Sequence, residues 1–147
     1  NKLAIDAPES ADDFNKADIT TGDRHLADLL YHCDAVASHI STLAIDAIVF
    51  DKPAFFIGFN TKPMPYHQGV RWFFDMDCAR DLIVTGAVKL SENMKEFEKQ
   101  LLAYLADPKL GEKERDFVRG RYCYKLVCKS GERLGKLLAD TLLGIRK

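Results

Sequence analysis

Two adjacent hydroxyl residues and a carboxylate stand at helical spacing in the middle of the chain. Ser41 and Thr42 follow a short run of small and β-branched residues, and Asp46 comes four residues after Thr42. Hydroxyls at the start of a helix can donate to a phosphate beside the free backbone N–H groups there. A carboxylate one turn later on the same face can accept hydrogen bonds from a ribose diol. The trio therefore indicates a nucleotide site with a diphosphate end and a ribose end.

A plainer interpretation fits the same residues. Ser41 or Thr42 can simply cap the helix, because either hydroxyl can accept a hydrogen bond from a free N–H of the first turn. Asp46 can be a solvated acid near the positive end of the helix dipole. The spacing leaves both interpretations open.

The elements that position the trio form a strand, helix and strand in sequence. Residues 34–38 and 54–58 are apolar runs typical of strands in a parallel sheet. The helix between them ends at Asp51, because Lys52 precedes Pro53 and is therefore pushed out of the α region. Such a crossover brings Ser41 and Thr42 to the carboxyl edge of the sheet, where open α/β sheets bind ligands.

The rest of the chain predicts more of the same architecture. Hydrophobic periodicity and capping residues indicate short strands over 2–7 and 87–90, and helices over about 24–33, 75–85, 91–107, 109–121 and 131–144. On the last helix we expect an inward face of Leu134, Leu137, Leu138 and Thr141. We expect a three-layer, Rossmann-like α/β fold, in which helices flank a mostly parallel sheet of about four or five strands.

Composition narrows the class of protein. The 147 residues fit a single domain over 1–147, and the net charge of −1 argues against a general nucleic-acid binder. The four cysteines show no metal-type spacing, so we expect reduced thiols and no metal. No charged region followed by an apolar core opens the chain, so we expect a cytoplasmic protein.

Further residues could reach the same edge. His39 directly precedes the hydroxyl pair and could touch a phosphate. Lys129 and Arg133 belong to a basic stretch near the end of the chain, which could return to the site and contribute positive charge to a diphosphate.

The segment from Ser41 to Pro53 resembles a motif of a known superfamily. It is similar to the Ser-Ser/Thr-x-x-x-Asp/Glu-Ala-x-x-x-x-Lys-Pro segment in the carboxyl-terminal, nucleotide-binding domain of glycosyltransferases with two facing Rossmann-like domains (the GT-B fold). Within that superfamily the chain looks most like the CDP-glycerol glycerophosphotransferase-like and surface-carbohydrate biosynthesis proteins. Residues 23–34 and 129–133 add weaker likeness, although Val127 and Cys128 replace the family's Asp-Gly.

This resemblance implies a donor-binding domain. The full protein would move a sugar or polyol phosphate from a nucleotide sugar or CDP-polyol to an acceptor, with no other cofactor. The chain would be a fragment whose amino-terminal acceptor domain is missing, so it would bind the donor without turnover and hold no catalytic residue itself. The resemblance leaves open a peripheral association of the full-length protein with a membrane.

The resemblance also assigns a loop. In those families the loop after the second strand flanks the nucleotide, which makes Tyr66, His67 and Arg71 the contacts expected here. The alternative is a surface excursion anchored by Trp72 and Phe73.

Two other functions remain open from the sequence. One is a sugar-nucleotide epimerase of the 2-epimerase type, and the other is a non-catalytic nucleotide-binding module. A hydrolase or reductase is disfavoured, because the chain has no Gly-x-Ser-x-Gly elbow, Gly-x-Gly-x-x-Gly turn or Gly-Lys-Ser/Thr loop.

Overall fold

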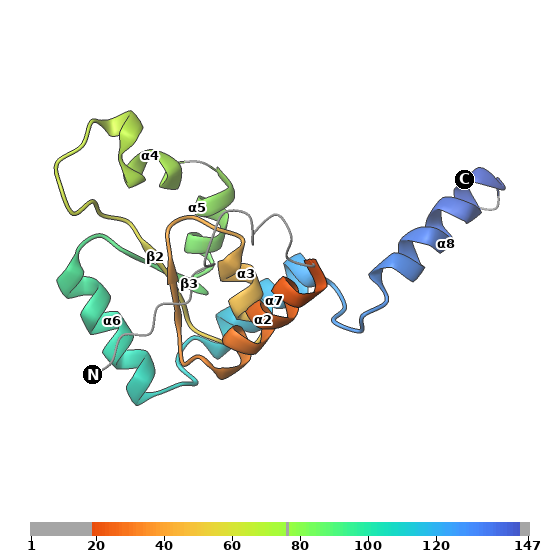
Figure 1. Cartoon of the computed structure of the whole chain (residues 1–147), viewed down its shortest axis with the longest axis horizontal. Coiled ribbons are helices and arrows are strands. Elements are labelled where there is room, and N and C mark those ends of the chain that lie inside the picture. The colour runs from red at the N-terminus through yellow and green to blue at the C-terminus, as the bar shows by residue number, and fades with distance from the viewer. Residues whose placement is uncertain (1–18, 76, 145–147) are drawn as a thin grey trace.

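The protein is an α/β domain built on a small parallel sheet. A computed structural model describes residues 19–75 and 77–144. The elements in chain order are α2 (Ile19–His32), β1 (Val36–Ser38), α3 (Leu43–Val49), β2 (Ala54–Ile57), the 3-10 helix η1 (Tyr66–Gln68), α4 (Val70–Phe74), α5 (Asp77–Val84), β3 (Val88–Ser91), α6 (Met94–Ala106), α7 (Glu112–Cys123) and α8 (Ser130–Leu142) (Figure 1).

The sheet has the order β1-β2-β3, and both pairings are parallel. Val36 lies opposite Ala54, and Ala54 opposite Val88. The expected α/β class is confirmed, and the arrangement is compatible with a Rossmann-like fold. The expectation of about four or five strands is not met by the three strands of the described residues. The strand predicted over 2–7 lies outside those residues.

Helices cover both faces of the sheet because β2 buries side chains on both. Phe55 packs edge to face against two rings of α6, Phe97 at 5.6 Å and Tyr104 at 5.4 Å between centroids. Phe56 points the other way, since neighbouring residues of a strand alternate, and its ring lies 5.5 Å from that of Phe74 in α4. It joins the main core, to which α3 contributes Ile48. This two-sided burial explains why β2 reads as a continuous apolar run.

A buried arginine ties α7 to the end of α3. The Arg115 side chain is fully buried, and its Nε donates to the Asp51 carboxylate at 2.7 Å. Its Nη1 donates to the Leu110 carbonyl at 2.7 Å, and its Nη2 to the Pro108 carbonyl at 3.3 Å. Asp51 has a positive φ of 57°, a conformation that Asp tolerates better than most residues. The turn after α3 and the turn before α7 are thus held by one side chain.

Tyr104 of α6 is buried beside the same turn, and burial raises its pKa above the ordinary value of 10.0. The unfolded chain keeps the ordinary pKa, so above it the unfolded state binds fewer protons than the folded state. We therefore expect the free energy of unfolding to fall as pH rises above about 10, by a component that Tyr104→Phe lacks. Urea unfolding of the unaltered chain and of the Tyr104→Phe variant, at about pH 8 and about pH 11, measures this component. Equal losses in both would contradict the prediction.

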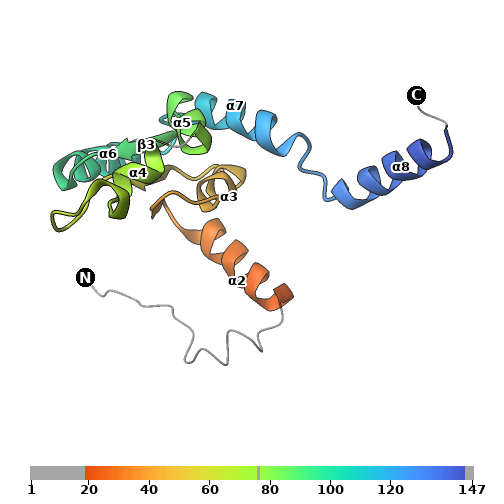
Figure 2. The same cartoon turned by 90° about the horizontal axis from the view of Figure 1, so that it is seen from above.

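The last helix departs from the sequence prediction. α8 extends away from the sheet and its covering helices in both views (Figure 1, Figure 2). The inward face predicted for it is wrong, because Leu134, Leu137, Leu138 and Thr141 are all exposed. Leu134 is 56% exposed and Leu138 is 54% exposed. Periodicity gave the apolar stripe of the helix but could not say whether a neighbour covers it.

Other differences are local. α2 begins at Ile19 rather than near residue 24, and α4 lies where a loop was expected. The start of α6 was misplaced: Ser91 ends β3 and donates to the Gln100 side chain, while Asn93 caps the helix by accepting from the Glu96 N–H at 3.0 Å. Gly86 follows α5 with a φ of 78°.

Candidate functional site

The carboxyl ends of the parallel strands form one edge of the sheet. β1 runs into a turn formed by residues 39–42, and β2 runs into the long loop that reaches η1. Since all pairings are parallel, these two connections leave the sheet at the same edge. This is the edge at which open α/β sheets bind ligands.

The start of α3 lies at this edge, and Ser41 caps it. The Ser41 Oγ accepts a hydrogen bond from the Leu43 N–H at 3.1 Å, whereas Thr42 makes no side-chain capping bond. The next two amides are also occupied, Ala44 by the Ser41 carbonyl at 3.2 Å and Ile45 by the Thr42 carbonyl at 2.8 Å. An anion here would therefore meet hydroxyl protons, because capping uses the Ser41 oxygen as acceptor and leaves its O–H free to donate.

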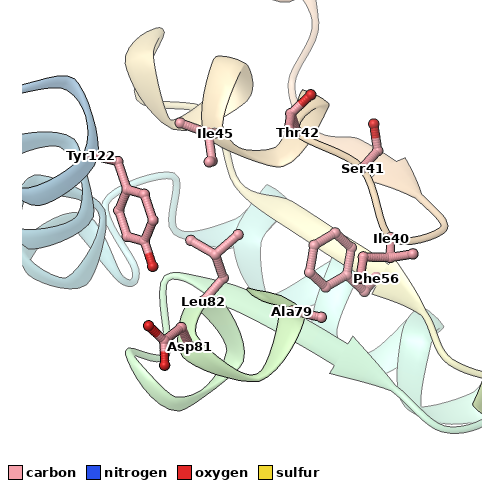
Figure 3. Close-up of a pocket in the computed structure, with 9 residues that line it drawn as sticks. All are labelled: Ile40, Ser41, Thr42, Ile45, Phe56, Ala79, Asp81, Leu82 and Tyr122. Carbon is pink, nitrogen blue, oxygen red and sulfur yellow. The ribbon is translucent and has the colours of Figure 1, made fainter. Parts of the chain in front are cut away.

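A cavity of about 420 Å³ opens beside the start of α3 and is called the α3 cavity below. Figure 3 shows its lining, which consists of Ile40, Ser41, Thr42, Ile45, Phe56, Ala79, Asp81, Leu82 and Tyr122. In that view the Ser41 and Thr42 hydroxyls point away from Phe56 and Leu82, and Asp81 and Tyr122 stand on the opposite side. The interior is thus apolar, with polar groups at two sides of the rim.

A second cavity, of about 480 Å³, lies under the loop after β2 and is called the loop cavity. Its lining consists of the apolar Ile57, Phe59, Met64, Val70, Met94 and Phe97, and the polar His39, Asn60, Thr61 and Gln68. A smaller cavity of about 230 Å³, the connecting cavity, is lined by His39, Ile40, Val70, Phe73 and Phe74. It shares Ile40 with the α3 cavity and His39 and Val70 with the loop cavity, so the three adjoin along the edge.

His39 stands where these cavities meet. Its Nδ1 lies 3.2 Å from the Ile57 carbonyl oxygen, which can only accept, so Nδ1 carries the proton of this bond. In the neutral ring Nε2 is then the acceptor. The sequence placed His39 beside the hydroxyl pair, and the structure brings it there.

Asp46 lies one turn beyond Thr42, on the exposed surface of α3. It does not belong to the lining of the α3 cavity, and within the described residues no ion pair holds its carboxylate. Its contact with a ribose therefore stays a prediction, and the contact would be made at the outer rim.

The three loop residues predicted to contact a nucleotide contact other groups of the protein. The Tyr66 hydroxyl donates to the Asp75 carboxylate at 2.6 Å, and this bond raises the pKa of Tyr66. Arg71 pairs with Glu92 at 3.0 Å, and the His67 ring packs against the Tyr66 ring. None of these three residues lines a described cavity of the edge.

Lys129 and Arg133 are not brought to this edge. Both belong to the start of α8, which extends away from the sheet (Figure 1). Lys129 lies 3.7 Å from a Glu132 carboxylate oxygen. Arg133 donates to the Ser130 hydroxyl at 2.9 Å, and its guanidinium stands 5.8 Å from the centre of the Tyr124 ring.

The sequence missed the residues that close the cavities from outside the βαβ unit. Asp81 of α5 and Tyr122 of α7 reach the α3 cavity only through tertiary packing, and no local pattern marks them. Asn60, Thr61 and Gln68 belong to the loop that the sequence did single out. A polar loop at a strand's carboxyl end was the available signal, but it could not tell which side chains turn inward.

Residues 19–75 and 77–144 contain no group of three or more His, Cys, Asp or Glu side chains placed to hold a metal ion. No helix in those ranges is both long and apolar enough to span a bilayer.

Comparisons with models of protein families, with curated proteins and with solved structures find no significant match to this chain.

Proposed function

We propose that this chain is the donor-binding domain of a transferase that moves a sugar or polyol phosphate from a nucleotide-activated donor to an acceptor. The observation that carries the proposal is the row of three adjoining cavities along the carboxyl edge, with Ser41 and Thr42 beside it. The resemblance of Ser41 to Pro53 to the GT-B donor motif supports the same assignment.

The shape of the site suits an elongated ligand with parts of different polarity. A nucleotide-activated donor has a flat base, a diphosphate and a hydroxyl-rich group in series. The apolar interior of the α3 cavity suits the base. Tyr122 and Asp81, whose carboxylate lies 3.5 Å from Arg121, would face the polar edge of the base. The Ser41 and Thr42 hydroxyls would meet the diphosphate, and Asp46 the ribose at the rim.

The charge of the site limits what the chain can do alone. Within the described residues, no Lys or Arg lines any of the three cavities. Charge that grows on a departing diphosphate must be stabilised by cations or amides in the transition state. Under this proposal, further positive charge and the acceptor's general base would come from a partner domain. The chain alone should bind a donor weakly and position it.

Calorimetric titration of the chain tests this proposal. We expect CDP or UDP to bind more tightly than inorganic phosphate or pyrophosphate, because only the nucleotide fills the α3 cavity. Thr42→Ala and Asp46→Ala should each weaken nucleotide binding by roughly tenfold, since each removes a hydrogen bond that involves a charged group. Only Thr42→Ala should also weaken pyrophosphate binding.

Lys113→Ala is the matched control, because Lys113 is exposed on α7 and lines none of the cavities. It should leave every affinity unchanged. Equal millimolar affinity for all anions, or equal losses in the control, would overturn the proposal.

A further inference from the structure

The lining of the loop cavity differs in kind from that of an anion site. Within the described residues it contains no Asp, Glu, Lys or Arg. Such a lining offers no counterion to a charged group, so it favours neutral ligands over charged ones. Its aromatic and thioether side chains offer apolar surface, and its amide, hydroxyl and imidazole groups offer hydrogen bonds. Such a mixture matches a ring with apolar C–H faces and hydroxyls around its rim.

We propose that the loop cavity binds a neutral sugar ring, the group that the donor carries. The inference rests on the proposed function and makes it more specific. It takes the transferred group to be a neutral hexose rather than an acidic sugar. The connecting cavity would carry the link from this ring to the diphosphate beside Ser41.

Two polar groups of the cavity are already oriented by the protein. The Asn60 carboxamide oxygen accepts the Val70 N–H at 3.1 Å, which leaves the amide NH2 free to donate. The bond from His39 Nδ1 to the Ile57 carbonyl leaves Nε2 as an acceptor in the neutral ring. One sugar hydroxyl can therefore accept from Asn60 while another donates to His39. Such oriented groups lower the ordering cost of binding.

The apolar side is also fixed. The Phe97 ring packs edge to face on the buried Phe55, at 5.6 Å between centroids. Gln68 completes the polar side from η1, a short helix held by the Gln68 N–H to Pro65 carbonyl bond at 2.9 Å. This bond uses only the Gln68 backbone, so the C=O and the NH2 of its side-chain amide both remain available for hydroxyls.

Substitution of Gly69 by alanine can test this site without a change in backbone conformation. A Cβ at Gly69 would lie 2.9 Å from the Asn60 amide nitrogen, and the φ of −89° suits alanine. Gly69→Ala should therefore displace the amide from its present position while the helix after it stays intact. Gln68→Ala removes a different polar contact at the same cavity.

The experiment compares UDP with UDP-glucose and UDP-glucuronate by calorimetry, and follows backbone amide shifts with methyl glucoside alone. We expect UDP-glucose to bind about fivefold more tightly than UDP, as one or two added hydrogen bonds allow. UDP-glucuronate should gain nothing. Gln68→Ala and Gly69→Ala should remove the gain and leave UDP affinity unchanged. Lys62→Ala, on the exposed side of the same loop, should change neither value.

The outcomes separate this inference from the proposed function. If UDP binds but glucose adds no affinity, or if UDP-glucuronate gains as much, the loop cavity is not a neutral-sugar site although the donor domain stands. If no nucleotide binds while methyl glucoside still shifts amides of residues 60–69 and Gln68→Ala abolishes the shifts, the donor assignment fails and the sugar site remains.

Discussion

Replacing Arg115 by methionine should lower the free energy of unfolding by about 3 to 4 kcal/mol. The guanidinium is fully buried and makes hydrogen bonds to the Asp51 carboxylate and to the Leu110 and Pro108 carbonyls. Methionine keeps much of the apolar volume but none of these bonds. The loss therefore reports the two unsatisfied carbonyls and the Asp51 carboxylate, which keeps Arg119 at 3.6 Å, rather than an empty space.

Urea unfolding followed by circular dichroism measures this loss. Arg119→Met is the matched control on the same helix, because Arg119 lies 3.6 Å from the Asp51 carboxylate but is only partly buried. It should cost less than about 1 kcal/mol. Asp51→Asn should also destabilise strongly, since it leaves the Arg115 charge buried without a counterion while asparagine tolerates the positive φ of residue 51. A change within 1 kcal/mol for Arg115→Met would contradict this account.

Filling the α3 cavity should abolish most nucleotide binding without harming the fold. Ala79 is buried in the wall of this cavity, and leucine there would extend into the open volume of about 420 Å³. Because the added carbons occupy space that is already empty, we expect unchanged or slightly higher stability. Loss of the apolar contacts of the base amounts to about 2 kcal/mol, or roughly a thirtyfold weaker affinity for UDP or CDP.

Ala103→Leu, the same exchange at an exposed position of α6, is the control and should bind as the unaltered chain does. Calorimetry and thermal unfolding of the three proteins decide the matter. Wild-type affinity in Ala79→Leu would mean that the base lies elsewhere, even if the nucleotide binds.

The central βαβ unit was predictable because each of its signals is local. The apolar runs of β1 and β2, the serine before α3 and the proline before β2 act within a few residues, and the observed β1, α3 and β2 follow them. The place of Ser41 at the carboxyl edge then follows from parallel pairing alone. Its capping bond to Leu43 was one of the two roles that the sequence offered.

The packing of α7 was not predictable, because a polar group decides it. Hydrophobicity favours Phe117 and Val118 as the buried pair, yet Phe117 is 57% exposed while Arg115 and Val118 are fully buried. Arg115 and Val118 share a helix face at a spacing of three, and this face meets α3. The partner that draws Arg115 inward is Asp51, which lies 64 residues earlier in the chain.

In the candidate site, too, the residues set by local signals were predictable and those set by tertiary packing were not. Residues fixed by the βαβ unit, Ser41, Thr42 and His39, reach the cavities. In the loop, the sequence pointed to Tyr66 and Arg71, which bind carboxylates at the surface, and to His67, which packs on Tyr66. It missed Asn60 and Gln68. An irregular loop has no period from which its inward side chains could be read.

The exposed leucines of α8 have a consequence for cooperativity. Leu134, Leu138 and Leu142 form an exposed stripe on a helix that extends away from the sheet (Figure 2). None of them lines the three cavities. Two ligands influence each other only when a shared change of state links their sites. Binding of a partner to α8 and binding of a ligand at the sheet edge should then be additive in free energy. Neither should change the dissociation constant of the other.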